Sequence, residues 1–190
     1  MKKIIPYGKH FIDNKDIKSV IKNLKSGSIT QGPAIEKFEN KIKKIVNSKY
    51  AVAVSSCTAG MHISLIACGF KKDNTLLTSP ITFVSTANVS KFCGGKVSFA
   101  DIDPNDLNIS LDEIKKKIKH RKIDAIIPVH FAGKSFNTKK LKKIINKKTI
   151  IIEDAAHAMG AKYEDGTMVG SCKYSHATVF SFHPVKTIAC

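Results

Sequence analysis

Polar or small side chains follow four predicted strands of this chain, in the segments 55–60, 79–88, 153–157 and 181–186. The carboxyl ends of parallel strands meet at one edge of a sheet, so we expect the four segments to lie together there. That edge would combine hydroxyls, an aromatic ring, a carboxylate and an amine. Each group has a chemical use and also an ordinary structural explanation.

The first two segments offer a place for a phosphate and for a planar ring. Thr58 and Ala59 begin a predicted helix, where hydroxyls and free backbone N–H groups bind anions, most naturally a phosphate. Ser and Thr in this position also serve as ordinary N-caps. Phe83 begins another predicted helix and can stack on a planar ring, although a core phenylalanine would give the same pattern.

The third segment ends an apolar strand with two acids. The second of them, Asp154, can hold a protonated ring nitrogen of a ligand or act as a helix N-cap, and both interpretations stay open. His157 follows three residues later, where we expect it to lie near Asp154 on one helix face. A lone histidine is often only structural.

The fourth segment places Lys186 just after an apolar strand, whereas the other lysines lie on polar helix faces. Burial lowers the pKa of a lysine, and a neutral amine can form a Schiff base. Ser181 can bind the same phosphate as Thr58. A phosphate cradle, a stacking ring, an acid for a ring nitrogen and a Schiff-base lysine are together what pyridoxal phosphate (PLP) requires.

The motifs of the four segments resemble those of the DegT/DnrJ/StrS-type nucleotide-sugar aminotransferases. They are Ser56-Cys57-Thr58-Ala59, Thr82-Phe83-Val84-Ser85-Thr86-Ala87-Asn88, Glu153-Asp154-Ala155-Ala156-His157-Ala158-Met159-Gly160 and Ser181-Phe182-His183-Pro184-Val185-Lys186. The resemblance covers essentially the whole chain, as the N-terminal half of such proteins. It implies the large domain of the fold type I PLP-dependent transferases, in truncated form, and a homodimer for the full-length protein.

The resemblance also implies residue roles, and no metal. Lys186 would carry the cofactor and move protons, Asp154 would pair with the pyridine nitrogen, and His157 would lie beside the phenolic oxygen. The implied cofactor-binding residues are Thr58, Ala59, Phe83, Asp154, His157, Ser181 and Lys186, and the implied substrate-binding residues are Tyr7 and Thr30. Relatives that dehydrate sugars have histidine in place of this lysine, so Lys186 favours transamination.

Three more motifs look most like family members that act in pseudaminic acid synthesis. They are Ile5-Pro6-Tyr7-Gly8-Lys9, Ile29-Thr30-Gln31-Gly32-Pro33 and His130-Phe131-Ala132-Gly133-Lys134-Ser135. This likeness implies L-glutamate as amino donor and the 4-keto carbon of a UDP-linked 4-keto-6-deoxy-hexosamine as acceptor. Another nucleotide keto sugar remains an alternative, as does an inactive truncated fragment.

Helical patterns alternate with short β-branched runs, which predicts an α/β fold with a mostly parallel sheet and helices on both faces. The predicted helices are residues 13–25, 33–46, 58–68, 83–91, 111–118 and 138–145, and the predicted strands are residues 75–78, 96–100, 125–129, 149–153 and 177–182, with a further apolar strand at 50–54. We expect an N-terminal arm and first helix at 1–32, and an incomplete PLP-binding domain at 33–190. The chain ends after a strand with no closing helix, which favours a fragment of a longer protein.

The composition excludes some classes of protein and argues against a nucleic acid partner. The chain has 190 residues, 43% of them hydrophobic and 25% charged, which excludes a fully disordered or collagen-like protein. Its net charge of +17 raises the alternative of a nucleic-acid-binding module. However, the lysines recur at helical spacing among apolar residues, and Arg121 is the single arginine. This pattern favours solvated helix faces, so we expect no nucleic acid partner.

The five cysteines form no CxxC pair and have no zinc-site spacing, which indicates reduced thiols. The N-terminus lacks the apolar core of a signal peptide, and no long apolar stretch occurs. We therefore expect a cytoplasmic protein with no membrane partner.

Overall fold

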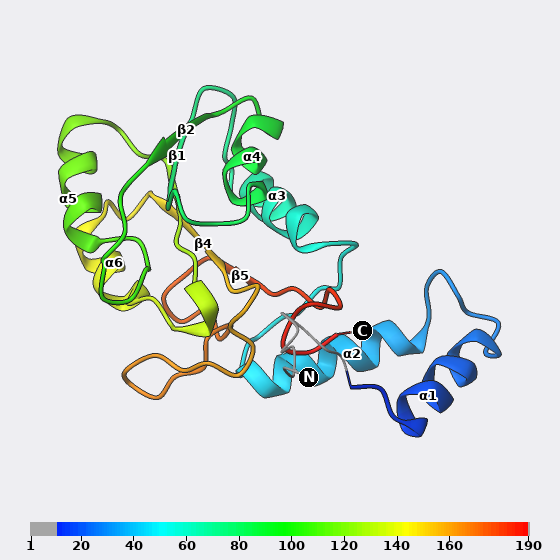
Figure 1. Cartoon of the computed structure of the whole chain (residues 1–190). Helices are drawn as coiled ribbons and strands as arrows, with labels where there is room; N and C mark the ends of the chain where they lie inside the picture. The colour runs from blue at the N-terminus through cyan, green and yellow to red at the C-terminus, as the bar shows by residue number, and fades with distance from the viewer. Residues whose placement is uncertain (1–10, 190) are drawn as a thin grey trace, which may run out of the picture.

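A computed structural model describes residues 11–189 as a parallel five-stranded sheet with the strand order β2-β1-β3-β4-β5 (Figure 1). The strands are β1 Thr75–Thr78, β2 Lys96–Phe99, β3 Ala125–Ile127, β4 Ile150–Asp154 and β5 Ala177–Val179. Every neighbouring pair is parallel. The predicted α/β fold is confirmed, and the carboxyl ends of the strands share one edge.

Helices cover both faces of the sheet, as predicted (Figure 1). They are α3 Cys57–Ala67, α4 Ser85–Phe92, α5 Leu111–His120 and α6 Thr138–Ile144, with a short 3-10 turn, η1, at Phe131–Gly133. On one face Leu65 of α3 and Val89 of α4 pack on Ile152, and on the other face Ile114 of α5 and Leu141 of α6 pack on Ile151. Successive residues of β4 therefore enter different cores, as the alternation of a strand dictates.

Two helices precede this body. In α1, Asn14–Leu24, the predicted N-cap Asp13 accepts the N–H groups of Lys15 and Asp16. No residue of α1 is buried, and its apolar side chains are exposed. In α2, Pro33–Val46, Phe38 meets Phe182 edge to face at 4.9 Å between ring centroids, which joins this helix to the segment after β5. The expected boundary at residue 32 stays a prediction.

The predicted strand at 50–54 is wrong for the described residues. The segment has no strand partner there, and Tyr50 and Val52 are 74% and 78% exposed. The Ala53 N–H donates to the Glu39 carboxylate at 2.7 Å. The described sheet ends at β5, which pairs with β4 alone, and the segment 50–54 does not add to either edge of this sheet. Composition cannot reveal that a strand-like run has no neighbour to pair with.

Three strands end earlier than predicted, and β2 does so by one residue, at Phe99. β5 stops at Val179 because its partner β4 ends at Asp154, the residue opposite Val179. β3 stops at Ile127, before Pro128, which has no N–H to donate to a strand ladder. The chain beyond Val179 is thereby released to cross the edge of the sheet.

The lysines predicted to lie on solvated helix faces are exposed on α1, α5 and α6 and in the loops beside these helices, as predicted. They are Lys18, Lys22, Lys25, Lys115, Lys116, Lys117, Lys119, Lys139, Lys140, Lys142, Lys143, Lys147 and Lys148. The described cysteines are free thiols. Within residues 11–189, no helix has the length and apolar character needed to cross a membrane.

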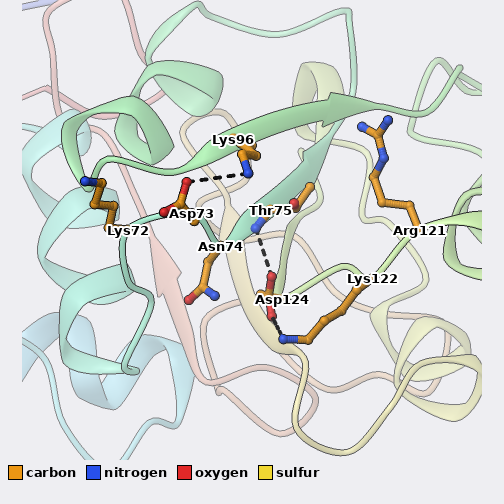
Figure 2. Close-up of a pocket in the computed structure, with 8 residues that line it drawn as sticks. All are labelled: Lys72, Asp73, Asn74, Thr75, Lys96, Arg121, Lys122 and Asp124. Atoms are coloured by element: carbon orange, nitrogen blue, oxygen red, sulfur yellow. Dashed lines mark hydrogen bonds and ion pairs between the residues drawn. The ribbon is translucent and has the colours of Figure 1, made fainter.

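At the amino edge of the sheet, Asp124 joins the starts of β1 and β3 (Figure 2). Its carboxylate accepts the Thr75 N–H at 2.9 Å and pairs with Lys122 at 2.8 Å. Partial burial alone would raise the pKa of Asp124, but these two partners outweigh it and hold the pKa below its usual range.

We predict that Asp124→Ala lowers the free energy of unfolding by about 1 to 3 kcal/mol at pH 7, because the partly buried Thr75 N–H loses its acceptor. A lowered folded-state pKa stabilises the fold above the ordinary value of 3.8, and this contribution disappears as the pH falls further. Urea unfolding at pH 7 and below pH 3.8 measures both effects. Asp112→Ala is the control, since its side chain is 80% exposed, and equal losses in the two variants would contradict this role.

Candidate active site

Asp154 stands at the carboxyl end of β4 and is 4% exposed. Its Oδ2 accepts the Thr86 hydroxyl at 2.8 Å, and its Oδ1 accepts the Ala156 N–H at 3.1 Å. Thr86 lies in the first turn of α4, and its hydroxyl is 2.7 Å from that of Thr82. The carboxylate is therefore fixed from two sides and retains lone pairs for a ligand.

Asp154 is not a helix N-cap. Residues 155–161 form turns, in which the Ala158 N–H donates to the Ala155 carbonyl. The expectation that His157 shares a helix face with Asp154 is therefore wrong. The run Ala155-Ala156-His157-Ala158 favours a helix by composition, but Ala155 and Ala158 are instead buried in a separate cluster with Tyr163 and Val169. Tertiary packing overrides the local preference.

Lys186 and His157 contact each other at the carboxyl edge of the sheet. Lys186 Nζ lies 2.8 Å from His157 Nε2, although the residues are 29 apart in sequence. The lysine is half-buried rather than fully buried. Desolvation of the imidazole lowers the pKa of His157, and the nearby Lys186 charge lowers it further, while Asp154 opposes the shift. This favours a neutral imidazole, whose Nε2 can accept a hydrogen bond from the Lys186 amine.

Cys57, the first residue of α3, lies near Asp154 and Lys186. Burial raises the pKa of its thiol to about 12, with the Asp154 charge adding to the rise and Lys186 opposing it. The mutual electrostatic influence places Cys57, Asp154, His157 and Lys186 in one neighbourhood. They come from three separate stretches of the chain, because Asp154 and His157 are only three residues apart.

The start of α3 has the geometry of an anion site. Ser56 is the N-cap, and its hydroxyl accepts the Ala59 N–H at 3.1 Å. Thr58 lies in the first turn and is half-buried. The cap occupies only one of the helix's first N–H groups, so others remain for an anion. Ser181 is half-buried and its hydroxyl accepts the His183 N–H at 3.4 Å, within its own loop.

Phe83 is 72% exposed in the connection that leads from β1 into α4. This exposure excludes the core interpretation of Phe83 and leaves its ring free to stack on a planar ligand.

The sequence reasoning assigned no role to Thr86 or Cys57, although both lie within quoted motifs. The spacing of Thr82 and Thr86, four residues apart at a helix start, was the available signal for a hydroxyl pair on one face. Thr30 lies exposed in the connection between α1 and α2, and Tyr7 falls outside the described residues, so both assignments stay predictions.

A cavity of about 420 Å³ lies elsewhere, at the amino edge of the sheet (Figure 2). Its lining residues include Lys72, Lys96, Arg121 and Asp124, and it shares none with the predicted site. Because the strands are parallel, this cavity and Asp154 lie at opposite edges. Within residues 11–189, no group of three or more His, Cys, Asp or Glu side chains is arranged to hold a metal.

The residues at the carboxyl edge fit PLP chemically. A buried carboxylate with free lone pairs suits a protonated ring nitrogen, an exposed phenylalanine suits the ring face, and a helix start suits the phosphate. An amine within hydrogen-bond distance of a histidine suits the aldehyde.

Comparison with known proteins places the fold. The structure matches a putative sugar aminotransferase, Spr1654 of Streptococcus pneumoniae, in its PMP form, with a TM-score of 0.89 and 25% identity over 97% of this chain and 50% of that one. It also matches PseC of Helicobacter pylori, an aminotransferase of pseudaminic acid biosynthesis, with a TM-score of 0.87 and 32% identity over 98% of this chain and 50% of that one. The fold is that of the PLP-dependent sugar aminotransferases.

The sequence comparison gives the family. The profile of the DegT/DnrJ/EryC1/StrS aminotransferase family matches residues 10–190, and the chain belongs to this family. An uncharacterized protein of Methanocaldococcus jannaschii, MJ1066, is 41% identical over 93% of this chain and 45% of its own length. The chain therefore spans about half the length of the curated relatives it matches.

We predict that Lys186→Met raises the pKa of His157 toward 6.5, because it removes a neighbouring positive charge. Asp154→Asn should move it the other way. Proton NMR titration of the imidazole signals measures both shifts, with His157→Asn assigning the resonance. An unchanged His157 titration in Lys186→Met would contradict the contact between the two residues.

Proposed function

We propose that the protein to which this chain belongs is a PLP-dependent aminotransferase with Lys186 as its catalytic residue. Family membership and the PLP and PMP forms in which Spr1654 was solved support PLP as the cofactor. The observation that carries the residue assignment is the contact of Lys186 Nζ with His157 Nε2 at 2.8 Å, at the edge where Asp154 is buried. When bound, PLP supplies an electron-accepting ring and an aldehyde that condenses with amines.

Asp154 keeps a ring nitrogen protonated in this proposal. A buried carboxylate in a low-dielectric site interacts strongly with a cation, and the Thr86 hydroxyl and Ala156 N–H hold it in one orientation. Removing its charge would leave a ring nitrogen without the partner that keeps its proton.

Lys186 acts as covalent anchor and as proton carrier at Nζ. His157 positions this amine through the hydrogen bond, and the neutral imidazole accepts from it without adding charge. Thr58, Ala59 and Ser181 are proposed to hold the phosphate, with the N–H groups of α3 and its dipole favouring the anion. Phe83 is proposed to cover one face of the ring.

For the substrate we propose L-glutamate and a UDP-linked 4-keto-6-deoxy-hexosamine of pseudaminic acid synthesis. The activity would be that of UDP-4-amino-4,6-dideoxy-N-acetyl-β-L-altrosamine transaminase, EC 2.6.1.92. Identity of 32% to PseC of H. pylori supports this choice, as do the motifs around Tyr7, Thr30 and His130. We further propose a cytoplasmic homodimer, with residues 33–190 forming part of its PLP-binding domain.

We predict that the complete gene product incubated with PLP is yellow and that Lys186→Ala abolishes the adduct trapped by borohydride, because no other amine is placed beside Asp154 and His157 within the described residues. Absorbance and mass mapping of the reduced peptide measure this. Lys140→Ala, on the exposed face of α6, is the control and should retain the adduct. Retention of a full adduct in Lys186→Ala would refute the assignment.

We also predict faster 2-oxoglutarate release from glutamate with the UDP-linked 4-keto-6-deoxy-hexosamine than with dTDP-linked 4-keto sugars. Groups that recognise the nucleotide and the sugar ring would raise kcat/KM for the matching substrate. The assay uses the purified complete gene product. Equal rates with all sugars would remove the pseudaminic acid assignment and leave the family unchanged.

A further inference from the structure

Beside Asp154, the chain buries a second carboxylate that the proposed chemistry does not use. Glu153 is 0% exposed and points to the opposite face of β4, the face covered by α5 and α6. Among residues 11–189, no lysine or arginine forms an ion pair with it. An ionised carboxylate without a cation is costly in a core unless hydrogen bonds replace its water shell.

Hydroxyl groups supply that shell. We call the group the Glu153 cluster, and it consists of Glu153, His130, Thr138, Tyr163, Ser175 and Thr178. Burial alone would raise the pKa of Glu153, but the neighbouring His130 and the hydroxyl donors outweigh it and hold the pKa below its usual range. The side chain therefore remains an anion throughout the physiological pH range.

His130 joins the cluster as a neutral ring. Its Nδ1 accepts the Phe136 N–H at 2.9 Å, so this nitrogen carries no proton and Nε2 does. Nε2 lies 3.4 Å from Glu153 Oε1, but it is not aligned for a hydrogen bond with this oxygen. The ring thus directs a dipole, and not a full charge, at the carboxylate.

The two oxygens of Glu153 serve different parts of the fold. Oε1 accepts from the hydroxyls of Thr138, the first residue of α6, and of Tyr163, in the latter case at 2.7 Å. Oε2 accepts from Ser175 at 2.6 Å and from Thr178 of β5 at 2.8 Å. Oε1 therefore binds α6 and the loop that contains Tyr163, whereas Oε2 binds β5 and the loop before it, which lead to Lys186.

The bond to Thr178 fixes a register. Thr178 is the residue opposite Glu153 in the parallel pairing of β5 with β4, and β5 contains only three residues. A slip by one residue would move β5 by about 3.3 Å and turn Val179 toward the carboxylate. Lys186 lies only seven residues after Val179. A shift of this size at β5 is longer than the 2.8 Å hydrogen bond between Lys186 Nζ and His157 Nε2, so it would break that contact if the intervening chain moved with the strand.

We propose that Glu153 is a positioning residue, whose Oε2 fixes the register of β5 through Ser175 and Thr178 and so delivers Ser181 and Lys186 to the cofactor. The inference rests on the proposed function of Lys186. It distinguishes Glu153 from Asp154, its neighbour in sequence. In this proposal Asp154 contacts the cofactor, whereas Glu153 determines the position of Lys186 Nζ.

The test compares donors to the two oxygens in the complete gene product. Ser175→Ala combined with Thr178→Val removes both donors to Oε2, and Thr138→Val removes one donor to Oε1 with the same change of shape. A purely structural role predicts similar effects for both. Two readouts follow β5 and Lys186. They are amide hydrogen exchange of residues 175–189 in the cofactor-free protein, and the rate at which the borohydride-trapped PLP adduct forms.

We predict that the Ser175→Ala/Thr178→Val variant exchanges faster in residues 175–189 and forms the adduct about tenfold more slowly or worse, because a small misplacement of a reacting group is costly. Thr138→Val should stay within about threefold of the unchanged protein, since Glu153 Oε2 keeps its bonds to Ser175 and Thr178. Thr178→Ser, which restores a hydroxyl, should rescue the rate.

Equal slowing by the two variants, or no slowing by either, would overturn the proposal. If the double variant does not fold, Thr178→Val alone provides the same comparison, because valine matches threonine in shape and lacks only the hydroxyl. Lys186→Ala separates the two hypotheses. Persistence of the adduct there refutes the proposed function, whereas its loss combined with equal behaviour of the Oε1 and Oε2 variants refutes the positioning role alone.

Discussion

The buried end of β4 is the constraint on which the rest of the site depends. Two adjacent carboxylates leave this strand toward opposite faces, and neither has a lysine or arginine within ion-pair distance among the described residues. Each is satisfied by hydroxyls and N–H groups, from Thr86 and Ala156 on one side and from the Glu153 cluster on the other. Because unsatisfied buried carboxylates are so unfavourable, these contacts fix α4, α6 and β5 around one point.

Most of the fold could be predicted from the sequence because its signals are local. The continuous apolar run that begins β4 predicts a strand buried on both faces, and the helical spacing in α5 predicts a helix buried on one face. Errors occurred where pairing partners decide the outcome. The segment 50–54 is apolar and β-branched like a strand, but it has no described neighbour, and β5 ends where β4 ends. No property of a segment alone contains that information.

The candidate site also has a part that could be predicted from the sequence and a part that could not. Residue types at strand ends pointed to Asp154, His157 and Lys186, and the fold places them at one edge. The support around them was out of reach, because Thr86 reaches Asp154 across 68 residues and Thr178 reaches Glu153 across 25. Long-range hydrogen bonds between common residue types leave no periodicity to detect. The sequence alone does not distinguish Glu153 from other acidic residues, because its complete burial is visible only in the structure.

The raised pKa of Cys57 has a consequence for selectivity between nucleophiles. An aldehyde entering this edge of the sheet meets both a sulfur and a nitrogen, and only a thiolate attacks carbonyls rapidly. With its pKa near 12, the sulfur keeps its proton at neutral pH. In the proposed function, this suppresses competition from thiohemiacetal formation and leaves the carbonyl to the Lys186 amine.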